Sequence, residues 1–311
     1  MSQETESEAW VSQKKEVRVF MEMLDLGSID SVSQTFNASF YFELVWLDDS
    51  LKHAGPGSLK MKLDEIWNPL IQILNQQSIQ QTFARRVEVF SDGRVVYRQR
   101  AWGTFSQPLQ LRDFPFDEQT IRIDLVAAGY SPEDLSLTID NGSGIAPVLS
   151  IPDWSVLDWR TQSGVIETGP ENTPVSTASL VVDLKRHPGF FIVKVLLPLV
   201  LIVLMSWTVF WINPQNAGPQ ISISVTAILT LIAFLFSMSS MLPRLPMLTR
   251  LDWFVMYSTF LVFFSLIEAV YTIRLANSGD LEKALLADRV ARWIFPLLLL
   301  AMLIHSFYWM S

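Results

Sequence analysis

Four long apolar segments in the last 122 residues constrain this chain more than any other feature. Each holds about the ~20 residues that an α-helix needs to cross the ~30 Å hydrocarbon core of a membrane. They lie at 190–212, 221–242, 251–273 and 290–310. The sequence therefore predicts a membrane domain with four spans and with both of its ends on the same side of the bilayer.

The connections between these segments are short, at eight residues for 213–220 and for 243–250 and 16 residues for 274–289. They leave no room for a further domain between the spans. Basic residues in the longest connection, with Arg292 beside it, favour a cytoplasmic location for that connection. Glu268 lies inside the third span, so we expect it to face protein or water rather than lipid.

The second apolar segment differs from the others because it carries seven Ser or Thr residues and no charge. Six of its positions recur at alternating steps of four and three and so share one helical face: Ser222, Thr226, Leu229, Ala233, Phe236 and Ser240. Such a stripe is suited to line a narrow water path, in which a ring of Leu229 or Phe236 would gate by dewetting. The alternative is that Ser and Thr only help the membrane helices to pack.

The first 189 residues have short runs of period-2 alternation, which predict β-strands. The clearest runs are 36–46, 85–102, 119–127 and 179–186, with a hairpin turn at 91–93. This region contains 16 Lys and Arg against 26 Asp and Glu, a net charge of −10, whereas the rest of the chain carries +2. We therefore expect an acidic all-β sandwich before the membrane domain.

Several classes of function find no support. The chain has no cysteine, which excludes disulfides, thiolate metal sites and cysteine nucleophiles. It has no basic patch for nucleic acid and none of the common hydrolase, nucleotide-binding or zinc-protease motifs. We expect no enzymatic activity, no cofactor and no metal.

Six motifs together carry a resemblance to a known family: WLDD (46–49), WNP (67–69), FPFDEQ (114–119), LKRHPGFF (184–191), LLP (196–198) and LPRLP (242–246). The chain resembles the prokaryotic pentameric ligand-gated ion channels of the Cys-loop receptor superfamily. The resemblance implies an extracellular immunoglobulin-like β-sandwich at 1–189 and a four-helix pore domain at 190–311. It also implies a homopentamer around a central pore, in contact with membrane lipid, in a bacterial inner membrane with the N-terminal domain outside. The two cysteines of the family loop would fall at Gln107 and Ile121, so the loop is not closed covalently here.

The resemblance also implies a coupling region between the two domains. In the family, the FPFD loop forms the foot of the extracellular domain and presses on the loop between the second and third spans. Asp117 is then expected to face Arg186, with Asp30 joining from another loop. The expected coupling residues are Asp30, Phe114, Pro115, Phe116, Asp117, Arg186, Pro243, Arg244 and Pro246. The alternative for Asp117 and Arg186 is a static salt bridge.

The agonist site departs from the family pattern. The aromatic positions expected for an ammonium-binding box fall at Leu74, Ala128 and about Val175. Arg98, Arg100 and Trp102 instead share one face of an alternating run, and Tyr41 and Tyr130 are also retained; an arginine-lined cleft suits a carboxylate better than an amine. The alternatives are an ordinary exposed strand face, or protons as the agonist, with His187 beside Arg186 as a candidate switch.

Ion selectivity is not encoded by a known motif, because residues 217–220 match neither the cation nor the anion pattern of the family. Five copies of the acidic domain would place a charge of about −50 around the vestibule and enrich monovalent cations there. We therefore expect cation selectivity. The alternatives are an anion-selective member of the family and a membrane-anchored receptor that does not conduct.

Overall fold

The computed structural model describes residues 14–239 and 248–309, which fall into two compact units. The first unit comprises the described residues up to Leu109 together with Gln119–Leu184. The second comprises Gln110–Glu118 together with the described residues from Lys185 onward. The loop at 110–118 therefore belongs to the same unit as the helices, which begin some 70 residues later in the sequence. It does not belong to the unit of the strands that flank it.

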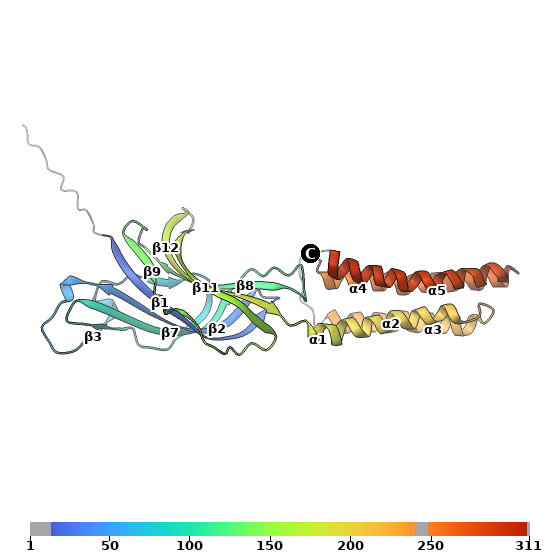
Figure 1. The fold of residues 1–311 in the computed structure, drawn as a ribbon, viewed down its shortest axis with the longest axis horizontal. Helices are drawn as coiled ribbons and strands as arrows, with labels where there is room; N and C mark the ends of the chain where they lie inside the picture. Colours follow the sequence, from blue (N-terminus) through green and yellow to red (C-terminus); the bar gives the residue numbers. More distant parts are fainter. Residues whose placement is uncertain (1–13, 240–247, 310–311) are drawn as a thin grey trace, which may run out of the picture. The chain divides into compact units, whose positions relative to one another are not determined.

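The first unit is a sandwich of two β-sheets (Figure 1). The larger sheet has the order β10-β1-β2-β7-β6-β3, with β5 paired to β7 and β9 paired to β1, and the smaller has the order β11-β12-β8-β4. The strands of the larger sheet are β1 (Lys15–Asp30), β2 (Thr35–Leu47), β3 (Leu59–Lys62), β5 (Gln76–Gln81), β6 (Arg86–Val89), β7 (Arg94–Ser106), β9 (Leu135–Ile139) and β10 (Gly144–Ile145). Those of the smaller sheet are β4 (Ile71–Ile73), β8 (Glu118–Ala127), β11 (Trp154–Thr168) and β12 (Thr173–Arg186).

The predicted alternation is the physical basis of this sandwich. Along β2 and the first part of β1, side chains at every second position are buried in one apolar core and the positions between them are at least partly exposed. Strands β7 and β8 also contribute to this core, but each has a run of consecutive buried residues. The hairpin predicted at 91–93 is confirmed, because the Phe90 and Arg94 backbones are hydrogen bonded across it and Gly93 has a φ of +83°. The predicted fold class is therefore confirmed for this unit.

The second unit contains four helical stretches that are long and apolar enough to cross a membrane: Gly189–Trp211, Ala217–Met238, Arg250–Asn277 and Leu281–Phe307. The first is built from α1 (Gly189–Phe191), a π-helical turn at Ile192–Leu196, α2 (Leu197–Trp207) and a 3₁₀ turn at Thr208–Trp211. The others are α3 (Ala217–Ser239), α4 (Arg250–Asn277) and α5 (Leu281–Ile304), which ends in a π-helical turn at His305–Trp309. Helix α4 contacts α2, α3 and α5.

One boundary predicted from the sequence is wrong. The fourth span was expected to begin at Val290, after a 16-residue connection, but α5 begins at Leu281 and only Ser278–Asp280 join it to α4. Polar residues at 281–289 lowered the hydropathy of this stretch without breaking its helix, since it contains neither Gly nor Pro. The longer α5 lets Asp288 lie inside the helix pair.

Local sequence explains two irregularities of the helices. Pro198 cannot donate a hydrogen bond to the carbonyl of Lys194, and the wide π turn lies directly before it. Helix α4 starts sharply because the Thr249 hydroxyl accepts from the Asp252 N–H while the Asp252 carboxylate accepts from the Thr249 N–H.

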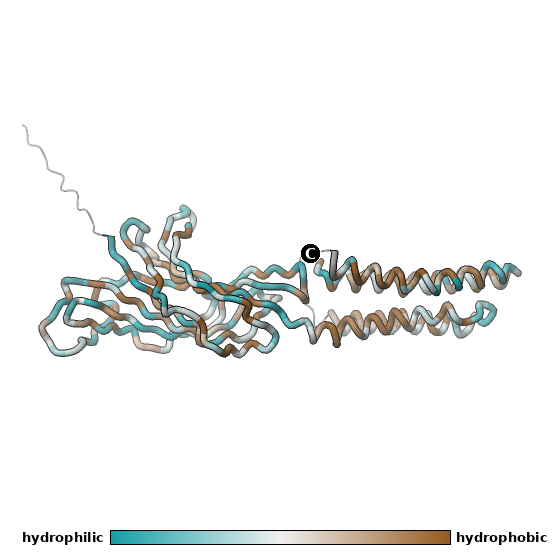
Figure 2. The backbone as a smooth tube through the Cα atoms, in the orientation of Figure 1, coloured by the Kyte–Doolittle hydropathy of each residue, from teal (hydrophilic) through white to brown (hydrophobic). Residues whose placement is uncertain are grey.

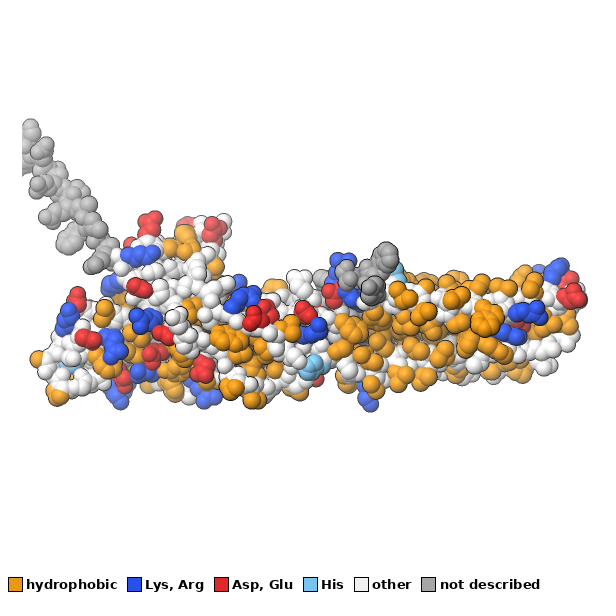
Figure 3. All heavy atoms as spheres, in the orientation of Figure 1, with side chains coloured by type: hydrophobic (Ala, Val, Ile, Leu, Met, Phe, Trp, Pro, Cys, Tyr) orange, Lys and Arg blue, Asp and Glu red, His pale blue; other side chains and the backbone are white. Residues whose placement is uncertain are grey.

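Surface chemistry separates the two units clearly. The tube coloured by hydropathy alternates along the strands and is mostly hydrophobic along the helices (Figure 2). On the face drawn in Figure 3, apolar side chains cover the helical unit almost continuously, whereas charged and apolar side chains are mixed on the β unit. A continuous apolar surface of this size is expected where lipid or other subunits cover it.

Candidate pore, coupling loop and ligand-binding strand

Helix α3 presents the predicted stripe on one face. Ser222, Thr226, Leu229, Ala233 and Phe236 are all exposed in the single chain, and Leu229 and Phe236 are 61% and 75% exposed. The opposite face is buried against the other helices and consists of Gln220, Ser224, Ala227, Leu231 and Met238. Ser240, the sixth predicted position, lies outside the described residues.

The exposed face of α3 carries hydroxyl groups at one end, which can bind water, and apolar side chains further along. The Thr226 hydroxyl donates to the Ser222 carbonyl at 2.7 Å, which leaves its lone pairs directed outward. Two bulky apolar residues, Leu229 and Phe236, follow one and three turns later. The order from hydroxyl-bearing to apolar side chains is the one that the sequence predicted.

The loop at 110–118 packs two phenylalanines onto the helical unit. The Phe114 ring lies 4.7 Å from that of Phe191 at the start of the first span, and the Phe116 ring lies 5.4 Å from that of Phe307 at the end of the last span. Phe114 is buried, and the Phe114–Pro115 peptide bond is cis. The loop therefore contacts the first and last spans directly.

An ion pair holds the end of this loop. Arg186 donates from Nε to Asp117 Oδ1 at 2.7 Å and from Nη2 to Asp117 Oδ2 at 3.1 Å, and the guanidinium also lies 5.0 Å from the centre of the Phe114 ring. The side chains are only 8% and 1% exposed. The expected partner of Asp117 is confirmed, and its two parallel bonds are of the strong, geometrically specific kind.

A second ion pair of the loop was missed by the sequence reasoning. Arg250, the first residue of α4, donates from Nε to Asp113 Oδ1 at 2.8 Å and from Nη1 to the Phe307 carbonyl at 3.1 Å. Its side chain is 9% exposed. The available signal was a charged residue at the first turn of an apolar span, together with an acid directly before the FPFD motif.

Three other predicted coupling residues, Pro243, Arg244 and Pro246, lie outside the described residues. Asp30 lies at the end of β1, where its carboxylate accepts from the Val32 and Ser33 backbone N–H groups at 2.8 and 3.3 Å. Hydrogen bonding, first from the Ser33 side chain, holds the pKa of Asp30 below its usual value. Asp30 is thus engaged in its own turn.

On β7, the predicted face of Arg98, Arg100 and Trp102 is present, but Arg98 is not a free cation. Its Nε donates to Glu43 at 2.6 Å and its Nη1 donates to Glu88 at 2.7 Å, since β2 and β6 flank β7. This bond lowers the pKa of Glu88. Within the single chain, the charge of Arg98 is therefore paired with two carboxylates of the neighbouring strands.

Arg100 and Trp102 remain exposed on that face, and Trp102 is 51% exposed. Tyr41 is the residue paired with Arg100 across β2 and β7, and its ring packs edge-on against Phe20 and Phe83. Burial, followed by the charge of Glu43, raises the pKa of Tyr41. Within one chain, Tyr41, Arg100 and Trp102 form a strip that presents a phenol ring, a positive charge and an indole ring.

Tyr130 has different neighbours from this strip. Its hydroxyl donates to the Asn68 carbonyl at 3.3 Å, and its ring lies 5.7 Å from that of Trp67. Lys15 Nζ lies 3.7 Å from the centre of the same Trp67 ring, which makes a cation–π contact. Tyr130 thus belongs to an aromatic cluster with Trp67 at the edge of the core.

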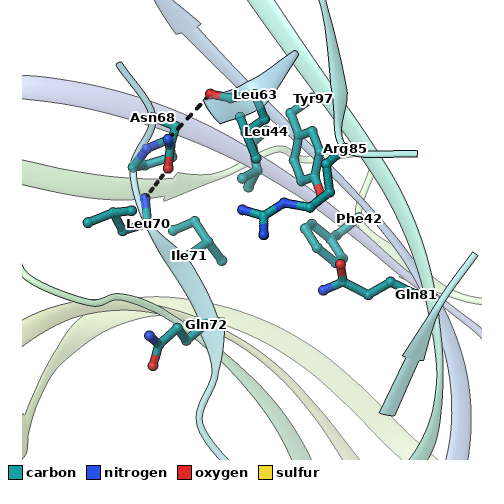
Figure 4. Close-up of a pocket in the computed structure, with 11 residues that line it drawn as sticks. Phe42, Leu44, Leu63, Asn68, Leu70, Ile71, Gln72, Gln81, Arg85 and Tyr97 are labelled. Atoms are coloured by element: carbon teal, nitrogen blue, oxygen red, sulfur yellow. Dashed lines mark hydrogen bonds between the residues drawn. The ribbon is translucent and has the colours of Figure 1, made fainter. Parts of the chain in front are cut away.

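A cavity of about 250 Å³ opens on the reverse side of the same strands (Figure 4). Phe42 and Tyr97, which alternate with Tyr41 and Arg98, form part of its wall, and Arg85 extends across it. Asn68 shapes the rim by donating to the Leu63 carbonyl and accepting from the Leu70 N–H. None of the five residues predicted to bind ligand is among the residues that line this cavity.

A β-sandwich joined to four membrane-crossing helices, with a buried aromatic loop pinned to the helices, defines a multi-pass membrane receptor. Two family models match the chain: the neurotransmitter-gated ion-channel ligand binding domain over residues 5–185, and the neurotransmitter-gated ion-channel transmembrane region over residues 195–285. The chain therefore belongs to the neurotransmitter-gated ion-channel family, which is the Cys-loop superfamily of ligand-gated channels. Members of this family are oligomeric channels gated by small-molecule ligands and are not enzymes.

Proposed function

We propose that the chain forms a homopentameric, cation-selective channel of a bacterial inner membrane, whose pore is lined by α3. The observation that carries this proposal is the exposed stripe of α3. The described residues of this stripe are exposed in the single chain, while the opposite face of the same helix is buried. A ring of such helices would enclose a path that is wet at the Ser222 end and narrow at Leu229 and Phe236.

The absence of cysteine makes a direct test simple, because any introduced thiol stands alone. Ala233→Cys would place a thiol on the stripe, and Ala227→Cys would place one on the buried face of the same helix. In reconstituted bilayers, a charged thiol reagent should block the current of the Ala233 variant and spare that of the Ala227 variant. Equal block of both variants, or of neither, would remove α3 as the pore-lining helix.

Cation selectivity rests on the acidity of residues 1–189, where 26 acidic residues outnumber 16 basic residues. The measurement is the reversal potential under a NaCl gradient. A value near the sodium potential supports the proposal, and one near the chloride potential would assign the chain to the anion-selective members. A complete absence of current under all ligands and pH values tested would favour the receptor that does not conduct.

We further propose that the agonist is a carboxylate. It would bind at the strip formed by Tyr41, Arg100 and Trp102, where a neighbouring subunit covers that strip. Protons are the alternative agonist. Replacing Arg100 by alanine should weaken the response to a carboxylate ligand, whereas Arg94→Ala, which changes an exposed arginine at the start of the same strand, should not. A proton response with no carboxylate response would favour the alternative.

The loop at 110–118 is proposed to couple this site to the pore. Its support is two ion pairs made by buried arginines: Asp117–Arg186, at the last residue of β12 and just before the first span, and Asp113–Arg250, at the first residue of α4. A movement of the loop would therefore act on the chain where two of the spans begin. Such bistable ion-pair boundaries are a common way to transmit a conformational change.

A further inference from the structure

Two acidic side chains meet inside the membrane-spanning helix pair α4 and α5, away from the pore stripe and the coupling loop. Glu268 lies nine residues before the end of α4, and Asp288 lies seven residues after the start of α5. At a rise of about 1.5 Å per residue, both are roughly 10–14 Å into their helices from the Ser278–Asp280 connection. Because the two helices are antiparallel neighbours, these positions come to the same level.

Both carboxyl groups are removed from solvent and lipid. Asp288 is 0% exposed, and all four carboxylate oxygens of the pair are buried without a hydrogen-bond partner in the structure. The two acids lie on helices α4 and α5, which contact each other, and their carboxyl groups interact electrostatically. A buried polar group without a partner is uncommon in a native fold, and for a carboxyl group it points to one that carries a proton.

One cation acts on the pair from a distance. Arg292, one turn beyond Asp288, interacts with it electrostatically, but the Arg292 Nε donates to the Phe210 carbonyl at 2.8 Å and its guanidinium lies over Trp211. The Thr272 hydroxyl donates to the Ala269 carbonyl at 3.1 Å. In the part of the chain that the structure describes, no ion pair includes Glu268 or Asp288.

The helices packed around the pair carry few other charges. Helices α2 and α3 contain no charged residue at all. On α4 and α5 the remaining basic residues near the connection are Arg274 and Arg289, which are exposed, and Lys283, which pairs with Asp280. Apart from each other, the polar groups that act on the acid pair are therefore Arg292 and the Thr272 hydroxyl.

An ionised carboxylate only accepts hydrogen bonds, so two of them cannot bond to each other. Two like charges at close range in a medium of low dielectric also cannot both persist. One proton resolves both conflicts, since it turns one carboxylate into a donor and reduces the charge of the pair to −1.

We propose that Glu268 and Asp288 bind one proton between them and thereby clamp α5 to α4 near the cytoplasmic side of the membrane. Release of that proton at alkaline pH leaves two facing negative charges and loosens the α4–α5 contact. Helix α4 also contacts α3, so the proton-binding site is one helix away from the proposed pore. This proposal rests on the insertion of the helices into a membrane, and it holds whether or not the pore conducts ions.

The test is infrared spectroscopy of the full-length protein in lipid nanodiscs, titrated from about pH 5 to pH 10. Wild type should show the C=O stretch of a protonated carboxylic acid at neutral pH, and this band should disappear on the alkaline side. Glu268→Gln/Asp288→Asn, which preserves the volume of both side chains, should lack the band. Either single variant should lose its band at a pH at least one unit lower than wild type, because an amide replaces the second acid.

Glu282→Gln is the matched control, since it removes an exposed acid from the first turn of the same helix, and its titration should match that of wild type. A wild-type spectrum identical to that of the double variant would overturn the proposal, as would a single variant that titrates like wild type.

Thermal unfolding gives a second measurement. The midpoint of wild type should fall on raising the pH from about 7 to about 10, and that of the double variant should fall by no more than half as much; equal falls would contradict the clamp.

Discussion

Replacing Asp117 by asparagine tests the loop anchor most sharply. In the wild-type protein both bonds from Arg186 are short, at 2.7 and 3.1 Å, and the two side chains are 1% and 8% exposed. The substitution keeps the shape of the side chain but removes the negative charge from a buried ion pair. Removing one partner of a buried ion pair typically costs about 3–5 kcal/mol of unfolding free energy.

For a protein of this size, ~1 kcal/mol corresponds to roughly 2–4 °C in the unfolding midpoint, so we expect a fall of about 10 °C. The assay is tryptophan fluorescence of the detergent-solubilised protein during heating at one fixed scan rate. Glu118→Gln is the control, because it breaks the ion pair of the next residue with Lys185, whose side chains are 57% and 55% exposed. An exposed pair contributes about 0–1 kcal/mol, so the control should shift by no more than ~3 °C.

A double-mutant cycle with Arg186→Gln isolates the pair itself. The Asp117→Asn/Arg186→Gln variant should be more stable than the sum of the two single effects predicts, because both members of the buried pair are then neutral. If the two effects add, or if Asp117→Asn shifts the midpoint no more than the control does, then the pair does not hold the loop in the way described.

Three further predictions concern stability. Gly103→Ala would place a Cβ on top of a backbone carbonyl of β5 at a φ of +153° and should prevent stable folding of the β unit, whereas Gly164→Ala meets only ordinary contacts and should change the midpoint little; expression and size-exclusion profiles compare them. The hydrogen bond from Arg98 lowers the pKa of Glu88 below its ordinary value of 4.5. The bond therefore stabilises the fold above about pH 4.5, and this stabilisation is lost as the pH falls further and Glu88 becomes protonated. Glu88→Gln should therefore lose less stability than wild type between about pH 6 and pH 3, by at most ~1 kcal/mol for this partly exposed pair; a larger acid sensitivity in the variant would contradict this assignment. Thr249→Ala removes the capping box of α4 and should cost about 1 kcal/mol in thermal unfolding, and Thr249→Ser should restore most of it, since serine caps equally well.

The sequence was most informative where a local period decides the structure. Alternation of side chains on strands and steps of three and four on helices depend on backbone geometry alone, so β2, the hairpin before β7 and the exposed face of α3 could all be predicted. Charge content likewise separated an acidic domain from an apolar one without any knowledge of contacts. Helix ends were less predictable. The first residues of α5 are polar but have high helix propensity, so a hydropathy pattern does not include them in the span.

Tertiary structure decided which charges meet. Arg98 shares a strand face with Arg100, yet only the register of β2 and β6 against β7 shows that Glu43 and Glu88 neutralise it. The resemblance supplied the partner of Asp117, whereas the sequence offered an unusual charge at Arg250 but not its partner Asp113, 137 residues away. The approach of Glu268 and Asp288 depends on how two antiparallel helices align along their axes. Side-chain periodicity determines the face on which a residue lies, but pairing across that face depends on packing between distant segments, and so it emerges only when the chain has folded.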